Sequence, residues 1–339
     1  MTIQNRKGVR QSAYDALAAN PGNPGLVVLL YIGILAVSGL VVSALLMVLD
    51  NRISQTGGLG DLGLRSILST IRTVLPIAQT VILWGVQLGY QNSTLRMARR
   101  QSAEPRDLKA GFACFGPLVR SVLLRGGLYL LIGTAACYAA TFLFMFTPMA
   151  ADFYELVSPL VTDPDAFYTA LSTDDTLFAQ VGATMWPVIP MFAVLFLAFA
   201  GPFFYQYRMV PYCILDDPRK GALRAMADSA RMMKGSRISL LKLDLGFWWF
   251  WLGQAVVALV LYGDVLLAAA GVVLPWSATV SYYVFYVLSL ALEGVLYYFF
   301  LNRVETTYAT AYEILRPRPQ PSKGAVLGNI FDLARDYHE

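Results

Sequence analysis

The stretch LVVLLYIGILAVSGLVVSALLMVL, residues 26–49, decides the fold class, because it is uncharged and long enough to cross a bilayer. A helix needs about 20 apolar residues to span roughly 30 Å of hydrocarbon. Comparable apolar stretches follow near residues 73–92, 118–147, 185–210, 246–274 and 278–301. The sequence therefore predicts an all-α polytopic membrane protein, with a six-helix transmembrane domain over residues 26–301.

The composition of the chain supports this class and argues against common kinds of active site. Hydrophobic residues make up 57% of the 339 residues and charged residues 14%, whereas soluble domains carry roughly 25% charged residues. The chain has one histidine, His338, and three cysteines without C-x-x-C spacing. Because zinc sites and Ser-His catalytic sets use these residue types, we expect no metal site, no cofactor and no enzyme activity.

The distribution of basic residues predicts the orientation. Most Lys and Arg lie before the first span, between spans two and three, between four and five, and after span six. Segment 148–184 has no Lys or Arg and carries six carboxylates, Asp152, Glu155, Asp163, Asp165, Asp174 and Asp175. The positive-inside rule then places the N-terminal segment 1–25 and the C-terminal tail 302–339 in the cytoplasm, and 148–184 outside. The carboxylates lack calcium-loop spacing, so we interpret them as a solvated cap, with a metal site as the alternative.

The residues after span six are predicted to form a cytoplasmic tail. The proline-rich run 316–321 cannot continue a helix and should be extended. Residues 328–339 could form a short helix that docks elsewhere, or could remain disordered. Both alternatives stay open at this point.

Residues 217–234 are predicted to form an amphipathic helix in the basic segment between spans four and five. Asp217 suits the helix start, and Gly235 suits the position after its end. The expected apolar face holds Leu223, Met226 and Met233, and the expected basic face holds Lys220, Arg224 and Arg231. Such a helix is expected at the cytoplasmic headgroup boundary, with its basic face near anionic lipid. Docking of a cytoplasmic or membrane protein partner is the alternative.

The segment from residue 212 to 248 carries a motif. It contains A-x-x-x-S-x-x-M-x-x-G, which includes Ser229 and Gly235, and L-x-L-D-L-x-F, which includes Asp244. With this motif the chain resembles an uncharacterised bacterial integral-membrane family, domain of unknown function 975. That family is similar to the membrane domain of some glycerophosphodiester phosphodiesterases. The resemblance implies a multi-pass protein of the bacterial plasma membrane with no established activity. We expect no phosphodiesterase activity, because residues after 302 are too few to build the catalytic barrel.

Arg125 lies well inside the third predicted span, and Glu293 lies well inside the sixth. At 1.5 Å per residue, both are roughly 12 Å deep from the cytoplasmic side. Because unpaired charges are costly in a bilayer, we predict that they pair as a lock between two helices. A polar site for an anionic lipid or substrate, and snorkelling without pairing, are the alternatives.

Three functions are compatible with these features. We expect a non-enzymatic membrane protein that assembles with partner proteins or organises lipid. The alternative is a permease-like transporter or transporter subunit, since a cytoplasmic helix between spans four and five is similar to that of ABC importer permeases. The chain has no phosphate-binding G-x-x-x-x-G-K-[ST] loop, so such a subunit would lack its own ATPase. A lipid-acting enzyme is the third possibility, and no nucleic acid partner is expected.

Overall fold

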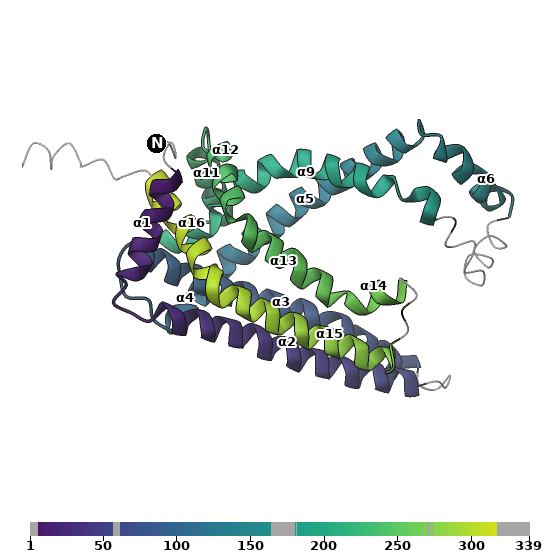
Figure 1. Cartoon of the computed structure of the whole chain (residues 1–339), viewed down its shortest axis with the longest axis horizontal. Helices are drawn as coiled ribbons and strands as arrows, with labels where there is room; N and C mark the ends of the chain where they lie inside the picture. The colour runs from purple at the N-terminus through teal and green to yellow at the C-terminus, as the bar shows by residue number, and fades with distance from the viewer. Residues whose placement is uncertain are drawn as a thin grey trace, which may run out of the picture.

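The computed structural model describes residues 6–56, 62–163, 180, 182–269, 272 and 274–316, and these form a helical assembly (Figure 1). Six helical stretches are long and apolar enough to cross a membrane: Pro24–Gln55, Gly63–Ala98, Phe115–Phe144, Gly182–Asp216, Arg237–Leu261 and Val280–Leu315. The prediction of an all-α polytopic membrane protein is confirmed.

The helices of a first group lie side by side in the lower part of Figure 1. It consists of α2 (Pro24–Gln55), α3 (Leu62–Ala98), α13 (Trp248–Leu261), the short α14 (Gly263–Ala269) and α15 (Ala278–Leu296). The start of α2 shows why the helix begins there. The Asn23 side chain accepts a hydrogen bond from the backbone N–H of Leu26 at 3.0 Å, and Pro24 occupies the first turn.

A second pair of helices, α5 (Phe115–Phe144) and α9 (Val188–Gln206), diverges from the first group (Figure 1). Helix α6 (Met149–Thr162) follows at the far end of this pair. It forms the first part of the predicted acidic segment 148–184. The carboxylates at 165, 174 and 175 lie outside the described residues, so the proposed cap stays a prediction.

The two groups meet at the left of Figure 1, where short helices gather, and we call this region the polar end. It consists of α1 (Arg6–Ala18), α4 (Asp107–Ala113), α10 (Val210–Asp216), α11 (Ala222–Met232), α12 (Arg237–Asp244), the 3-10 turn η2 (Leu245–Phe247) and α16 (Asn302–Leu315). The long α15 reaches it through one π-helical turn, η3 (Tyr297–Leu301).

The predicted C-terminal tail, residues 302–339, begins with a helix. Residues 302–315 form α16, which packs against α1 and α3 and buries Val304, Tyr308, Ala309 and Tyr312. The sequence did not indicate this helix, because most of its buried residues are tyrosine, threonine and alanine, which raise hydropathy little. The remaining part of the predicted tail, residues 317–339, lies outside the described residues.

Ion pairs and hydrogen bonds join the helices of the polar end. Arg99 pairs with Asp216 of α10 at 2.8 Å and with Glu313 of α16 at 2.6 Å, and Arg316 pairs with Asp216 at 2.8 Å. Burial lowers the pKa of Arg99, but its hydrogen bonds to the two carboxylates outweigh burial and raise that pKa above its ordinary value. The network therefore ties the ends of α3, α10 and α16 together.

Glycine allows α3 and α4 to touch at backbone distance. A Cβ atom added to Gly89 would lie 2.0 Å from the carbonyl oxygen of Leu108, and one added to Gly111 would lie 2.0 Å from that of Gly85. Any side chain at these positions would force the two helices apart. The contact fixes α4 against the end of α3.

The predicted amphipathic helix forms, but over a shorter range and with a different buried face. Helix α11 begins at Ala222, five residues later than expected, because Asp217 is extended and its carboxylate accepts from the backbone N–H of Arg219 at 3.2 Å. The buried residues of α11 are Ala222, Ala225 and Ser229. Leu223, expected to be buried, is 71% exposed, so that part of the prediction is wrong. Met233 is buried as expected, and Met226 partly so.

Candidate functional site

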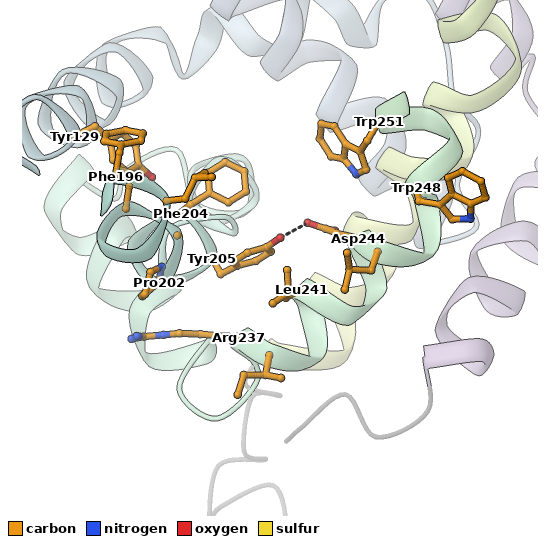
Figure 2. Close-up of a pocket in the computed structure, with 15 residues that line it drawn as sticks. Tyr129, Phe196, Pro202, Phe204, Tyr205, Arg237, Leu241, Asp244, Trp248 and Trp251 are labelled. Carbon is orange, nitrogen blue, oxygen red and sulfur yellow. Dashed lines mark hydrogen bonds between the residues drawn. The ribbon is translucent and has the colours of Figure 1, made fainter. Parts of the chain in front are cut away.

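An apolar groove of about 1000 Å³ lies where α5 and α9 meet α12 and α13. Figure 2 shows its two walls. One wall carries aromatic side chains of α5 and α9, among them Tyr129, Phe196 and Phe204. The other carries Leu241 of α12 and, from α13, Trp248 and Trp251. The groove therefore has the lining of a site for a hydrocarbon chain.

The groove exists because one segment of α9 presents small residues to it. Ala200, Gly201 and Pro202 follow one another in α9 and leave the space between the aromatic walls open. A Cβ atom added to Gly201 would meet no atom within 4 Å. The sequence of α9 thus keeps this face free of bulky side chains.

Asp244 is the buried acidic residue of the groove. Its side chain accepts hydrogen bonds from the hydroxyl of Tyr205, at 3.0 Å, and from the hydroxyl of Tyr308 on α16 (Figure 2 shows the former). Asp244 is 5% exposed. With both oxygens used by tyrosines, Asp244 joins α9, α12 and α16 and acts as a structural anchor rather than a free acid.

The other two motif residues also have structural roles at the polar end. The hydroxyl of Ser229 donates to the carbonyl oxygen of Gln206 at 2.8 Å, so α11 is held against the end of α9. Gly235 has a backbone φ of +83°, a left-handed conformation that glycine adopts without strain. It ends the α11 segment and allows the chain to turn into α12.

Arg237 supplies the positive charge at one end of the groove. It begins α12, and one terminal N–H donates to the side-chain oxygen of Gln206 at 2.7 Å. In Figure 2 its side chain extends toward α9 below Pro202. The Nε atom of Arg237 is buried and has no hydrogen-bond partner. A buried guanidinium donor without an acceptor is costly, so this end of the groove favours an anionic group.

The predicted intramembrane pair is not formed. The Nε of Arg125 donates to the backbone carbonyl of Ser121 at 3.2 Å. Glu293 interacts with Tyr297, one turn along the same helical run. Among the ion pairs of the described residues none joins Arg125 to Glu293, so equal depth did not place the two side chains together.

Two of the three residues of the predicted basic face pair with one acidic residue of α11. Lys220 pairs with Asp228 at 3.2 Å, and Arg231 also pairs with Asp228. Arg224 is exposed. The sequence analysis did not identify Arg237, because a single basic residue in a basic segment carries no distinguishing pattern.

The polar groups of the groove are few. They are a cation, a doubly hydrogen-bonded carboxylate and tyrosine hydroxyls. Among the described residues, no three His, Cys, Asp or Glu side chains are grouped so that they could hold a metal ion.

Comparison with known proteins gives a family but no functional precedent. No curated protein and no solved structure matches the chain. A family model matches residues 1–319, which include every span, the motif segment and the residues that line the groove. The chain therefore belongs to the family described as "Protein of unknown function (DUF975)".

Proposed function

We propose that this membrane protein binds an anionic phospholipid and so organises lipid in the bacterial plasma membrane, without catalysing a reaction. An acyl chain occupies the groove between α9 and α13, and the phosphate lies beside Arg237 at the cytoplasmic face. The similarity to the membrane domain of glycerophosphodiester phosphodiesterases stays a prediction. So does assembly with partner proteins.

The observation that supports the proposal most is the combination of an apolar groove with an unpartnered cationic donor at its end. The groove walls are aromatic and aliphatic, and the Nε of Arg237 is buried without an acceptor. A phospholipid has the same arrangement of apolar chain and anionic group. One lipid molecule would fill the groove and supply the acceptor.

The headgroup should decide which lipid binds. A hydrocarbon chain gains little by moving from the bilayer into the groove, because lipid tails are as apolar as the groove walls. A phosphate beside Arg237 gains a charge-assisted hydrogen bond, which contributes about 1.5–3 kcal/mol. Gln206 already holds one terminal N–H of the guanidinium, so the side chain is oriented before the lipid arrives.

Filling the groove tests where the lipid lies. Gly201→Phe places a ring into space where the added Cβ meets nothing within 4 Å, so the variant should fold and lose bound lipid. Gly127→Phe is the matched control, because Gly127 is also open on α5 but does not line the groove. Native mass spectrometry of the detergent-purified proteins counts the retained lipids. Equal lipid retention in both variants would contradict the proposed position.

Removing the charge tests the headgroup. Arg237→Gln should weaken binding of phosphatidylglycerol by about tenfold or more, the loss of one charge-assisted hydrogen bond. Binding of diacylglycerol, which has no phosphate, should change less. Arg224→Gln removes an exposed charge on the neighbouring α11 and serves as the control. If the two arginine variants weaken phosphatidylglycerol binding equally, the effect is general surface charge and the assignment to Arg237 is wrong.

A further inference from the structure

A second cavity, of about 200 Å³, lies among α2, α3, α13 and the run from η3 into α16. It differs from the groove in being polar: Arg208, Glu305, Gln91 and Gln254 are part of its lining. These residues come from segments far apart in the sequence. With Gln87, which also lines the cavity, two charged and three amide side chains surround one space.

Arg208 is held in place by rings and presents unused donors. Its guanidinium carbon lies 4.3 Å from the ring centre of Tyr308 and 5.4 Å from that of Phe204. Stacking of this kind occupies the faces of the guanidinium and leaves its N–H edges available. With the residues that the structure describes, the guanidinium of Arg208 forms neither a hydrogen bond nor an ion pair. A fixed cation therefore faces the cavity without an acceptor.

Gln254 provides a second unused donor. Its side-chain nitrogen is buried and has no hydrogen-bond partner, and the residue lines the same cavity. A buried amide N–H without an acceptor is unfavourable. Two independent donors thus point to an acceptor-bearing occupant, most simply a carboxylate group.

Glu305 supplies the opposite charge. Its carboxylate accepts from the hydroxyl of Tyr212 at 3.2 Å and interacts with the amide of Gln91, both neutral groups. Among the described residues no cation forms an ion pair with Glu305. The cavity therefore holds one cation and one anion that do not neutralise each other by direct contact.

We propose that this cavity binds a small zwitterion of the α-amino acid type. The ligand carboxylate would accept from Arg208 and Gln254, and the ligand ammonium group would donate to Glu305. A simple anion would satisfy Arg208 but would be repelled by Glu305, and a simple cation would have the reverse problem. A permease-like transporter, the alternative prediction from the sequence, would need such a site. The proposal does not depend on lipid binding in the groove.

The size of the cavity limits the ligand. Pockets for drug-sized molecules measure about 300–1,000 Å³, so 200 Å³ admits only a small molecule. The competing occupant is a cluster of several water molecules, since each takes about 30 Å³ in the liquid. Alanine is therefore a suitable probe, because its side chain adds only one methyl group to the two charged groups.

The first experiment compares three probes on the full-length protein in detergent. L-alanine carries both charges, acetate only the carboxylate, and ethylammonium only the ammonium group. Isothermal titration calorimetry, with the shift of the unfolding temperature as a second measurement, should detect L-alanine binding. Each of the two half-probes should bind at least about tenfold more weakly, because each lacks one charge-assisted contact.

The second experiment separates the two ends of the ligand. Glu305→Gln should weaken L-alanine binding by about tenfold but leave acetate binding equal or tighter, because it removes the repulsive carboxylate. Arg208→Gln should abolish binding of both. The control is Arg303→Gln, since Arg303 lies on α16, is exposed and does not line the cavity. If Arg208→Gln does not fold, Gln254→Leu should still weaken L-alanine binding.

Three outcomes would overturn the proposal. Absence of L-alanine binding at millimolar concentration would mean that the cavity holds only water. Acetate binding as tight as L-alanine binding, unchanged by Glu305→Gln, would define a simple anion site. L-alanine binding that is unaffected by Arg208→Gln and by Gln254→Leu would place the ligand elsewhere. If the protein binds L-alanine but does not bind phosphatidylglycerol specifically, this proposal stands and the lipid proposal is rejected.

Discussion

Tyr308 donates a hydrogen bond to Asp244, a residue 64 positions earlier in the chain, and both side chains are buried. The contact joins α16 to α12 next to the apolar groove. Tyr205 of α9 donates to the second oxygen of the same carboxylate. One aspartate therefore holds three helices together, in a region where hydrophobic burial contributes less than it does in a soluble protein.

Removing the Tyr308 hydroxyl should destabilise the protein. Tyr308→Phe keeps the ring beneath Arg208 but leaves one Asp244 oxygen without its donor, which should cost about 1–3 kcal/mol. Unfolding in mixed detergent micelles measures the difference. Tyr298→Phe is the control, because Tyr298 is 44% exposed and should change stability little. Similar losses in both variants would argue against a special role for the Tyr308–Asp244 contact.

The ion pairs of Asp216 and of Asp50 should contribute differently to the free energy of unfolding. Asp216→Ala removes the partner of both Arg99 and Arg316, and its side chain is 13% exposed, so we expect a loss of about 1–3 kcal/mol. Asp50→Ala removes an exposed partner of Arg72, with both side chains 53% exposed, and should cost about 0–1 kcal/mol. The smaller effect should disappear at high salt. A larger loss for the Asp50 variant would reverse this ranking.

A glycine inside the α3–α4 contact and a glycine outside it should respond oppositely to substitution by alanine, as measured by the free energy of unfolding. Gly89→Ala brings a Cβ to 2.0 Å from a backbone oxygen and should cost about 1–3 kcal/mol or more. Gly126→Ala, in the middle of α5, meets no atom within 4 Å and should be neutral or stabilising by about 0.5–1 kcal/mol. Thermal unfolding of the two purified variants checks both signs. Tolerance of Gly89→Ala would show that α4 can move away from α3.

Arg125 and Glu293 should behave as independent residues. The structure shows separate partners for them, so the losses caused by Arg125→Met and Glu293→Gln should add in the double variant, within about 0.5 kcal/mol. The measurement is a double-mutant cycle of unfolding free energies. Recovery of stability in the double variant would instead support the ion pair between Arg125 and Glu293 that the sequence predicted.

The membrane orientation predicted from the basic residues can be tested by labelling. Asp152→Cys should react with an impermeant maleimide from outside intact cells, whereas Arg224→Cys should react only after the membrane is opened. The three native cysteines are first replaced. Labelling of position 224 from outside would invert the topology and move the proposed phosphate site to the other leaflet.

The sequence predicted the spans well because length and hydropathy alone determine whether a helix can cross a bilayer. It predicted the buried face of α11 poorly, since a leucine such as Leu223 is not forced inward in a membrane protein. Small residues face inward there, as Ala225 and Ser229 do, because they let helices approach closely. Depth along a helix was also insufficient to predict whether Arg125 and Glu293 pair, because depth does not give the direction in which a side chain points.

The two proposed binding sites could not be predicted for a different reason. The groove brings together residues of α5, α9, α12 and α13, and the polar cavity combines Arg208, Gln254 and Glu305. Each residue type occurs elsewhere in the chain without such surroundings. Only the packing of helices distant in sequence leaves donors of Arg237, Arg208 and Gln254 without an acceptor.

The burial of α16 has a consequence for biosynthesis. Synthesis runs from the N-terminus, so residues 302–315 leave the ribosome after most of the spanning residues have entered the membrane. This helix supplies three hydrogen-bond partners. Tyr308 donates to Asp244 and Tyr312 donates to Asp216. Asn302 accepts from the hydroxyl of Tyr90. A nascent chain stalled before residue 302 would lack one hydrogen-bond partner for each of Asp244, Asp216 and Tyr90. Translation of α16 therefore completes the hydrogen bonds of the polar end.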